Sequence, residues 1–478
     1  MISPHALIYL FAYLVPALVG FLALIVYTHL LSPTEYGVYV IGSSIAAIIS
    51  AVFFAWVRQS VLRYQASFPT LDFRAEAIIA YGGTAALVAC LTPVAVLIAL
   101  PGIGFGVLAG SVFLSLSFTA FEISQEFTRA QLNPLRFAAV SFTRSTLGLA
   151  LGYFAIKLGF GGLGLLIGIG ASFLIANVFS FPRSADKPLR LSSADYLTQF
   201  VRYGLPFSLG ALAFSLHSVL DRLGVAYLLG ESGAGYYGVT ADMTRQLIGV
   251  LATSVASAMF PLAFRSHAEA GPVAARERLK EGIELLLALI APVTVWLAIS
   301  ADVVAGTLLG AEFQLSVATL LPLLALGRMC GAVNQFYLQV SFQLAEKPLL
   351  QVAHDILILG LNIALLFALT IAFGLPGTAA AVLIAEALGI ALGIGLSRRA
   401  FKLPLNGPGI ARVLAATSAM AAVTYATKAA SAGHGLLTLL CLLAGGGVAY
   451  AGAALLLDVA GIRTLAASLL WPRGVPAE

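Results

Sequence analysis

The sequence predicts an all-α polytopic membrane protein with about fourteen transmembrane helices. Of its 478 residues, 60% are apolar and only 10% are charged, whereas a soluble protein is nearer half apolar and a quarter charged. The mean hydropathy is +0.98. A membrane helix needs roughly 20 apolar residues, so this composition supplies about fourteen spans and leaves little for soluble domains. A soluble enzyme is therefore excluded.

The expected spans follow one another as continuously apolar runs, which favours helices, because barrel strands would be about ten residues long and alternating. The first run is longer than the apolar core of a signal peptide and no basic segment precedes it, so we expect it to be kept as a span. The runs lie near residues 6–31, 37–56, 77–100, 106–128, 138–156, 161–181, 204–229, 238–264, 282–301, 316–340, 351–373, 377–396, 411–429 and 436–457.

The basic residues predict the orientation of these spans. With the N-terminus in the cytoplasm, the cytoplasmic segments hold twenty lysines and arginines, and the outer segments hold only Lys157 and Lys428. This asymmetry follows the positive-inside rule. We therefore expect a multi-pass protein with both termini in the cytoplasm.

An internal repeat predicts the domain organisation. The turn LLSPTEYGVY at 30–39 aligns with LLGESGAGYY at 228–237, which pairs Gly37 with Gly235 and Tyr39 with Tyr237. Two repeats around a central cavity are a recurrent transporter plan. The prediction is an N-lobe of helices 1–6 in 1–181, a cytoplasmic linker in 182–203, a C-lobe of helices 7–12 in 204–396, and an extra helix pair, 13 and 14, with a cytoplasmic tail in 397–478.

Other motifs exclude several functions. No segment is long enough for a folded extramembrane domain, and without a GxxxxGK[ST] loop we expect no ATP hydrolysis. The cysteines have no CxxC spacing and lie in apolar runs, so we expect buried thiols and no disulfide, metal or cofactor. The GxxxG matches at 164–168 and 389–393 predict close helix packing. The cysteines are Cys90, Cys330 and Cys441.

Ionisable residues inside the predicted spans are the strongest functional signal, because such groups usually face a bundle interior or a wet cavity. Arg328 and Glu386 lie near the middles of their spans, and Asn334 adds a polar group close to Arg328. Two simpler interpretations stay open: a snorkelling Arg144, and a structural ion pair between Asp242 and Arg245. The embedded ionisable residues include Arg144, Arg222, Arg245, Arg328, Glu122, Asp242 and Glu386.

Four embedded arginines favour an anionic ligand, because guanidinium groups bind phosphate bidentately and stay charged at physiological pH. A cation exporter would instead need acidic residues in excess. The embedded charges are nearly balanced in sign, so this argument alone does not decide between the two.

Several segments carry a family resemblance. They are the turn at 30–39 with the following FFAWVRQSVLRY, the stretch YGLPFSLGALAFSLHSVLDRLGVAYLLGESGAGYYGV, and LLGAEFQLSVATLLPLLALG at 308–327. Together they resemble the polysaccharide transporter family of Wzx-like O-antigen and exopolysaccharide flippases, within the MOP (MATE-like) superfamily. The resemblance covers about the first 400 residues and rests on many weak matches.

The resemblance implies a non-enzymatic flippase of the bacterial plasma (inner) membrane. Such a protein moves a polyprenyl-diphosphate-linked oligosaccharide outward by alternating access, for lipopolysaccharide or exopolysaccharide synthesis, coupled to H⁺, Na⁺ or the membrane potential. Its partners would be membrane lipids and the polysaccharide polymerase machinery, with no nucleic acid. The substrate-binding candidates are Arg328, Arg222, Arg245, Arg144, Arg58 and Asn334, and the ion-coupling candidates are Glu386, Asp242 and Glu122.

Two alternatives stay open. A MATE-type ion-coupled multidrug antiporter predicts a cavity dominated by acids. A membrane polysaccharide ligase or polymerase predicts a large outer loop with catalytic polar residues, and the predicted outer loops are short.

Overall fold

A computed structural model describes residues 4–68, 71–99, 104–131, 133–180, 191, 193–431, 433 and 435–463. These residues form helices joined by turns and bends, and no strand occurs among them. The chain divides into two compact units, Met1–Val239 and Thr240–Glu478. The all-helical membrane fold predicted from composition is confirmed, whereas the division into six-helix lobes stays a prediction.

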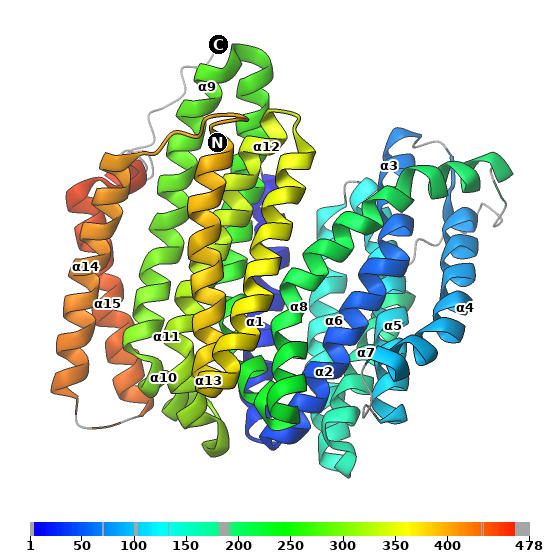
Figure 1. Cartoon of the computed structure of the whole chain (residues 1–478), viewed down its shortest axis with the longest axis horizontal. Coiled ribbons are helices and arrows are strands. Elements are labelled where there is room, and N and C mark those ends of the chain that lie inside the picture. The colour runs from blue at the N-terminus through cyan, green and yellow to red at the C-terminus, as the bar shows by residue number, and fades with distance from the viewer. Residues whose placement is uncertain are drawn as a thin grey trace. The chain divides into compact units, whose positions relative to one another are not determined.

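Unit 1 contains nearly all of the first ten helical elements and ends within the last of them (Figure 1). They are α1 (Pro4–Thr28), α2 (Pro33–Ile49), the π-helix η1 (Ser50–Phe54), α3 (Ala55–Ser67), α4 (Arg74–Ala99), α5 (Phe105–Ala130), α6 (Pro134–Ala155), the π-helix η2 (Ile156–Phe160), α7 (Gly161–Ser180) and α8 (Ala194–Thr244).

Unit 2 contains the remaining elements. They are the π-helix η3 (Arg245–Gly249), α9 (Val250–Ile299), α10 (Ala301–Leu308), α11 (Ala311–Val333), the π-helix η4 (Asn334–Leu338), α12 (Gln339–Leu344), α13 (Pro348–Ser397), α14 (Gly407–Ala430), α15 (Leu436–Leu457) and a 3₁₀ turn, η5 (Val459–Gly461).

Local sequence explains where the helices begin. Ser32 and Glu35 form a capping box at the start of α2, where Ser32 Oγ accepts from the Glu35 backbone N–H and the Glu35 carboxylate accepts from the Ser32 N–H. Pro33 fills the first helical position, where no backbone donor is needed. An asparagine cap followed by proline repeats this logic at α6, where Asn133 accepts from the Arg136 N–H.

Three helices of about 50 residues are each too long for one crossing. At 1.5 Å per residue they would extend roughly 75 Å, against a hydrocarbon core of about 30 Å. Each is interrupted by a glycine with positive φ: Gly230 in α8, Gly271 in α9 and Gly374 in α13. In Figure 1 the two limbs of α13, 348–373 and 375–397, lie antiparallel.

Nine helical segments in the described part of the chain are long and apolar enough to cross a membrane. Some of them contain a glycine interruption and therefore two limbs, as Pro348–Ser397 does. The protein is thus a multi-pass membrane protein. The count of fourteen spans stays a prediction.

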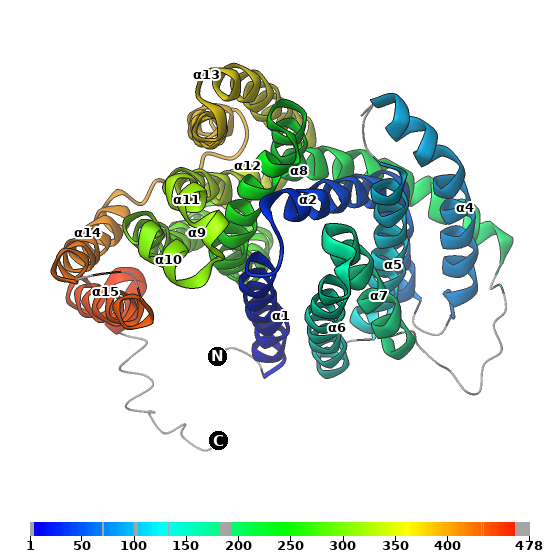
Figure 2. The same ribbon diagram turned by 90° about the horizontal axis from the view of Figure 1, so that it is seen from below.

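Helices α5, α6 and α7 form a closely packed layer of unit 1, side by side in Figure 2. A Cβ built on Gly168 of α7 would lie 3.0 Å from the backbone of Leu151 and Gly152 in α6. The GxxxG match at 164–168 therefore permits the close helix packing that the sequence predicted.

Aromatic side chains join α3, α4 and the start of α8. The rings of Tyr64 and Phe200 stack at 5.1 Å, and Phe73 packs beside both. Ser60 donates to the Phe200 carbonyl oxygen at 2.8 Å. The predicted linker is accordingly helical from Ala194 onward, because its aromatic side chains recur at helical spacing and pack on unit 1. Residues 181–190 lie outside the described residues.

Helices α14 and α15 pack on α9 and α10 within unit 2 (Figure 2). Trp296 of α9 donates to the Leu442 carbonyl oxygen of α15 at 3.2 Å, and Tyr450 of α15 donates to the Ala288 carbonyl oxygen of α9 at 2.6 Å. The extra C-terminal pair is therefore fixed to the second limb of α9, 272–299, by specific polar contacts as well as by apolar packing.

The expectation of buried cysteines is wrong at two positions. Cys90 and Cys441 are exposed, and Cys330 is half-buried. The outward faces of these helices are themselves apolar, as the exposed Leu91 and Leu440 illustrate. In a membrane protein such faces meet lipid, so an apolar sequence does not separate interior from surface.

Candidate functional site

Four charged side chains cluster in unit 1 between α3 and α5. Arg58 Nη1 lies 3.2 Å from Glu122 Oε2, and Arg58 Nε lies 3.8 Å from Glu126 Oε1. Arg129 Nη1 donates to both Glu126 oxygens, at 3.1 and 3.3 Å. The Glu126 side chain is only 4% exposed, so its charge depends on these two arginines.

Arg144 of α6 lies apart from this four-charge cluster. Its guanidinium stands 4.7 Å from the centroid of the Phe173 ring of α7, in cation–π geometry, and the residue is half-buried. Tyr27 of α1 donates to the Gly148 carbonyl oxygen one turn farther along α6. Helices α1, α6 and α7 thus hold one arginine in an otherwise apolar setting.

The first limb of α8, 194–229, carries Asp221 and Arg222. Asp221 is 9% exposed, and Tyr237 of the second limb, 231–244, donates to its Oδ2 at 3.2 Å. Arg222 is half-buried. The hydrogen bond from Tyr237 thus links the second limb of α8 to the first limb at Asp221, next to Arg222.

Glu386 and Asn334 meet inside unit 2. The Asn334 amide nitrogen donates to Glu386 Oε2 at 2.7 Å and to the Glu386 carbonyl oxygen at 2.9 Å. Both residues are buried, at 6% and 5% exposure. A Cβ on Gly331 would lie 3.1 Å from Glu386 Oε1, so this glycine leaves room for the carboxylate. Asn334 begins the π-helix η4, and such segments are frequent at functional sites.

Asp242 and Arg245 form an ion pair, with Arg245 Nη2 3.0 Å from Asp242 Oδ1. The Asp242 side chain is 8% exposed and that of Arg245 is 61% exposed. Arg245 begins the π-helix η3. Arg328 lies half-buried in α11, away from either end of that helix.

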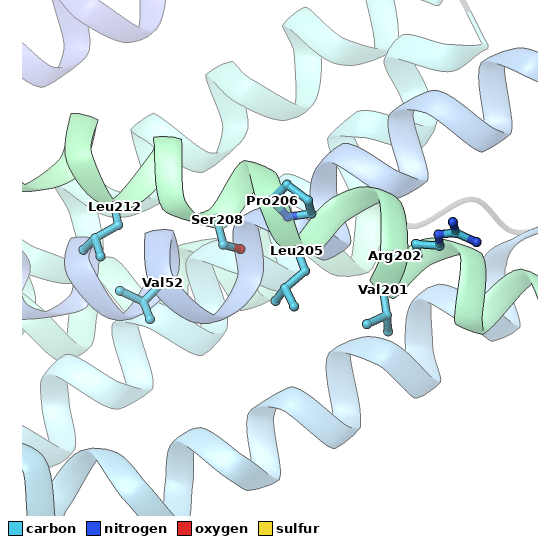
Figure 3. Close-up of a pocket in the computed structure, with 7 residues that line it drawn as sticks. All are labelled: Val52, Val201, Arg202, Leu205, Pro206, Ser208 and Leu212. Carbon is cyan, nitrogen blue, oxygen red and sulfur yellow. The ribbon is translucent and has the colours of Figure 1, made fainter. Parts of the chain in front are cut away.

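An apolar groove of about 580 Å³ lies between η1 and the first limb of α8 (Figure 3). Arg202 lies at one end of it and Leu212 at the other. Hydrocarbon side chains dominate the lining, which suits an alkyl chain and not a charged headgroup. The lining residues are Val52, Val201, Arg202, Leu205, Pro206, Ser208 and Leu212.

The structure brings six of the nine predicted site residues together as three pairs: Arg58 with Glu122, Asn334 with Glu386, and Arg245 with Asp242. The other three, Arg144, Arg222 and Arg328, lie on separate helices.

Sequence reasoning did not select Glu126 and Arg129, which complete the four-charge cluster. Their spacings were a signal, because residues four and three apart, such as Glu122 with Glu126 and Glu126 with Arg129, share a helix face. Within the described residues, no group of three or more His, Cys, Asp or Glu side chains is placed to hold a metal ion.

Comparison with known proteins agrees with this architecture. The model of the polysaccharide biosynthesis protein family matches residues 26–318, more than half of the chain. Among curated proteins, none matches the sequence.

Solved structures share the fold at low identity. A lipid II flippase, MurJ, in an inward closed conformation is 14% identical, with a TM-score of 0.71 over 94% of this chain and 98% of that chain. An inward-facing multidrug resistance MATE family transporter of the MOP superfamily is 14% identical, with a TM-score of 0.63 over 82% and 97%. A MOP superfamily transporter from Pyrococcus furiosus is 14% identical, with a TM-score of 0.56 over 82% and 94%. The chain belongs to the polysaccharide biosynthesis protein family, whose model covers more than half of it.

Proposed function

We propose that this protein moves a polyprenyl-diphosphate-linked oligosaccharide from the inner to the outer leaflet of the bacterial plasma membrane by alternating access. Both termini face the cytoplasm in this proposal, and no catalytic step is involved. Membership of the polysaccharide biosynthesis family supports a glycan cargo, and the likeness to a lipid II flippase supports a lipid-linked one.

The observation that carries the proposal is the pairing of embedded carboxylates with arginines. Glu122 and Glu126 are bound by Arg58 and Arg129, and Asp242 is bound by Arg245. An antiporter for cationic drugs requires carboxylates that attract the drug, and these acids are already neutralised. The pairing therefore weighs against a cationic cargo, and the family's role in polysaccharide biosynthesis favours a lipid-linked glycan instead.

The cargo's headgroup explains why such a protein is needed. Each polar group moved into hydrocarbon without a partner costs several kcal/mol. Arginines at membrane depth offset part of this cost, because guanidinium groups bind phosphate oxygens through charge-assisted hydrogen bonds. The candidates for binding the diphosphate fall into two groups. Three lie on separate helices: Arg144, Arg222 and Arg328. Two already pair with a carboxylate that would compete with the diphosphate: Arg58 and Arg245.

A coupling ion would supply the driving force. One charge moved across 100 mV provides about 2.3 kcal/mol. Glu386 is the first candidate for the coupling group, because it is a buried carboxylate near the middle of its predicted span. Asp242 and Glu122 follow. H⁺ and Na⁺ are both compatible with a carboxylate.

The experiment is a deletion strain in which lipid-linked oligosaccharide is measured and its leaflet is probed in spheroplasts. The proposal predicts accumulation in the inner leaflet, reversed by the wild-type gene but not by Arg328→Ala. Arg265→Ala is the matched control, because the Arg265 side chain is exposed and forms an ion pair with the exposed Glu269. Normal turnover of the oligosaccharide in the deletion strain would contradict the proposal.

A MATE-type antiporter is the second candidate. Likeness to a multidrug MATE transporter and the buried Glu386 favour it. It predicts that the deletion strain exports glycolipid normally and becomes sensitive to cationic dyes, so the same strain separates the two functions.

A further inference from the structure

A row of residues runs through unit 2 from the half-exposed Asp355 to the buried Glu386. Polar contacts join its members except at one step, where Gly389 packs beside Asn334. The Asp355 side chain is 37% exposed, whereas His354 is 1% exposed and Glu386 is 6% exposed. The row joins both limbs of α13 to η4 and α12. Its members in order are Gln351, Gln339, Asp355, His354, Gly389, Asn334 and Glu386.

The contacts of His354 determine its tautomer. His354 Nε2 lies 2.9 Å from the Gly389 carbonyl oxygen. A carbonyl oxygen only accepts hydrogen bonds, so Nε2 carries a proton and donates it. His354 Nδ1 is then a lone pair in the neutral ring or the site of a second proton. Among the described residues, no donor forms a hydrogen bond to this buried Nδ1.

Asp355 faces that same nitrogen. Its Oδ1 lies 3.6 Å from His354 Nδ1, and Gln339 Nε2 donates to Oδ1 at 3.1 Å. With a neutral ring, the lone pair of Nδ1 faces a carboxylate oxygen, which is a repulsive arrangement. One proton on Nδ1 converts it into an attractive ion pair. Imidazole is the side chain that exchanges protons most readily near neutral pH.

The GxxxG match at 389–393 makes room for this row. A Cβ on Gly389 would lie 2.6 Å from Ile358 Cδ1 and 2.9 Å from Asn334 Nδ2. A Cβ on Gly393 would lie 2.6 Å from Leu338 Cδ1 and 2.9 Å from His354 Nε2. Both glycines therefore accommodate polar side chains. Gly389 is the shared contact, because its carbonyl oxygen binds His354 while its Cα packs against Asn334.

Glu386 lies one turn from Gly389 on the same face of α13, since residues three apart are neighbours on a helix. The Asn334 amide donates twice to Glu386, which leaves Asn334 Oδ1 as a buried acceptor with no hydrogen bond from any described residue. The charged and titratable groups on the elements packed around the row include Asp355 and Glu386 on α13, Arg328 and Cys330 on α11, and Glu284 on α9, which is bound by Arg412.

We propose that His354 and Asp355 form a proton-binding pair that couples transport to the proton gradient. A hydronium ion reaching the Asp355 end gives one proton to His354 Nδ1 and leaves as water. One O–H bond of the hydronium breaks, one N–H bond forms, and the positive charge passes to the ring. The imidazolium then forms an ion pair with the Asp355 carboxylate beside it. The coupling role rests on the proposed function, whereas proton binding by the pair does not.

The test is solid-state NMR of the full chain, labelled at its histidine rings and reconstituted in lipid, between pH 5 and 8. His354→Asn identifies the His354 signals among those of the six histidines. We expect His354 to pass from the Nε2–H tautomer to the doubly protonated ring. In Asp355→Asn the doubly protonated ring should be lost over this range, because the carboxylate oxygen 3.6 Å from His354 Nδ1 is removed. His267→Asn is the control, since that ring packs on Phe401 outside the row.

A His354 ring that keeps one tautomer across this range, or a doubly protonated ring that persists unchanged in Asp355→Asn, would overturn the proposal. The deletion strain separates this outcome from failure of the proposed function. If the deletion strain exports oligosaccharide normally while His354 gains a second proton, the flippase function is wrong and the proton-binding pair stands. If the deletion strain fails to export oligosaccharide while His354 keeps one protonation state, the proton-binding pair is wrong and the flippase function stands.

Discussion

Gly37 and Gly235, which the repeat aligns at an offset of 198 residues, lie against each other where α2 crosses the second limb of α8. A Cβ on Gly235 would lie 3.1 Å from the Gly37 nitrogen. A Cβ on Gly37 would overlap the Glu231 carbonyl oxygen, and one on Gly235 would overlap the Pro33 carbonyl oxygen. Pro33 and Glu231 are aligned by the same offset. The contact is therefore self-complementary, as contacts across a two-fold axis are.

This crossing predicts that Gly37→Ala destabilises the protein. The added methyl group meets backbone and not a flexible side chain, so the helices must move apart, which costs about 1–3 kcal/mol or more. The measurement is the thermal unfolding midpoint in detergent. Gly82→Ala is the matched control, because a Cβ there has no neighbour within 4 Å, and an alanine in a helix interior stabilises it by about 0.5–1 kcal/mol. Equal midpoints for the two variants would contradict the crossing.

The four-charge cluster predicts that Arg129→Ala is costly. The variant removes the closer arginine and leaves the buried Glu126 carboxylate with Arg58, whose Nε lies 3.8 Å away. Breaking a buried ion pair costs about 3–5 kcal/mol of folding stability. Glu126→Gln combined with Arg129→Ala should recover much of the stability. Arg265→Ala, in an exposed pair, should cost less than about 1 kcal/mol. The unfolding midpoints of these variants test the cluster, and a double variant no more stable than Arg129→Ala would refute the account.

The hydrogen bonds from the buried Asn334 amide to Glu386 predict that Asn334→Leu destabilises the protein more than Glu386→Gln does. Asn334→Leu removes the donor to Glu386, and a buried acceptor without its donor costs about 1–3 kcal/mol, more for a charged group. Glu386→Gln keeps a side-chain acceptor of similar shape and should cost less. The check is again thermal unfolding, and the opposite order of stabilities would count against the pairing.

Asp302 and Lys428 predict a pH dependence. Burial opposes ionisation of Asp302, but its ion pair with Lys428 at 2.6 Å and contacts with backbone N–H groups outweigh burial and hold the pKa of Asp302 below its usual range. A lowered pKa stabilises the folded state above the unfolded value of about 4, and the gain is lost as the pH falls through the folded value. Lys428→Gln should therefore be less stable than wild type at pH 7, with the difference shrinking below about pH 4. A difference that is constant from pH 7 to pH 3 would contradict this role.

The two GxxxG matches illustrate how far the sequence predicts this fold. At 164–168 Gly168 meets helix backbone, as expected, whereas Gly389 and Gly393 meet side chains. Gly389 meets Ile358 and Asn334, and Gly393 meets Leu338 and His354. The motif indicates only that two small residues lie four apart on one face of a helix. What approaches that face depends on partners distant in sequence, such as Asn334, which single-sequence patterns do not encode.

The candidate site was predictable to a similar degree. Embedded charge identified Glu386, Asp242 and Glu122, because ionisable groups in apolar runs are rare. Which arginine neutralises each acid followed from the sequence only for Asp242 and Arg245, which share a helix turn. The contact between Arg58 and Glu122 joins two helices, so it required the tertiary structure.

The most direct measurement of the central claim is transport by the purified protein in proteoliposomes loaded with lipid-linked oligosaccharide. Glycan newly exposed on the opposite leaflet is read by its accessibility to a glycosidase. We predict transport by the wild type and by Arg265→Ala, and loss of at least about tenfold, or 1.4 kcal/mol, in Arg144→Ala, because one charged contact to the diphosphate is removed. Equal exposure of glycan with and without the protein would contradict the assignment as a flippase.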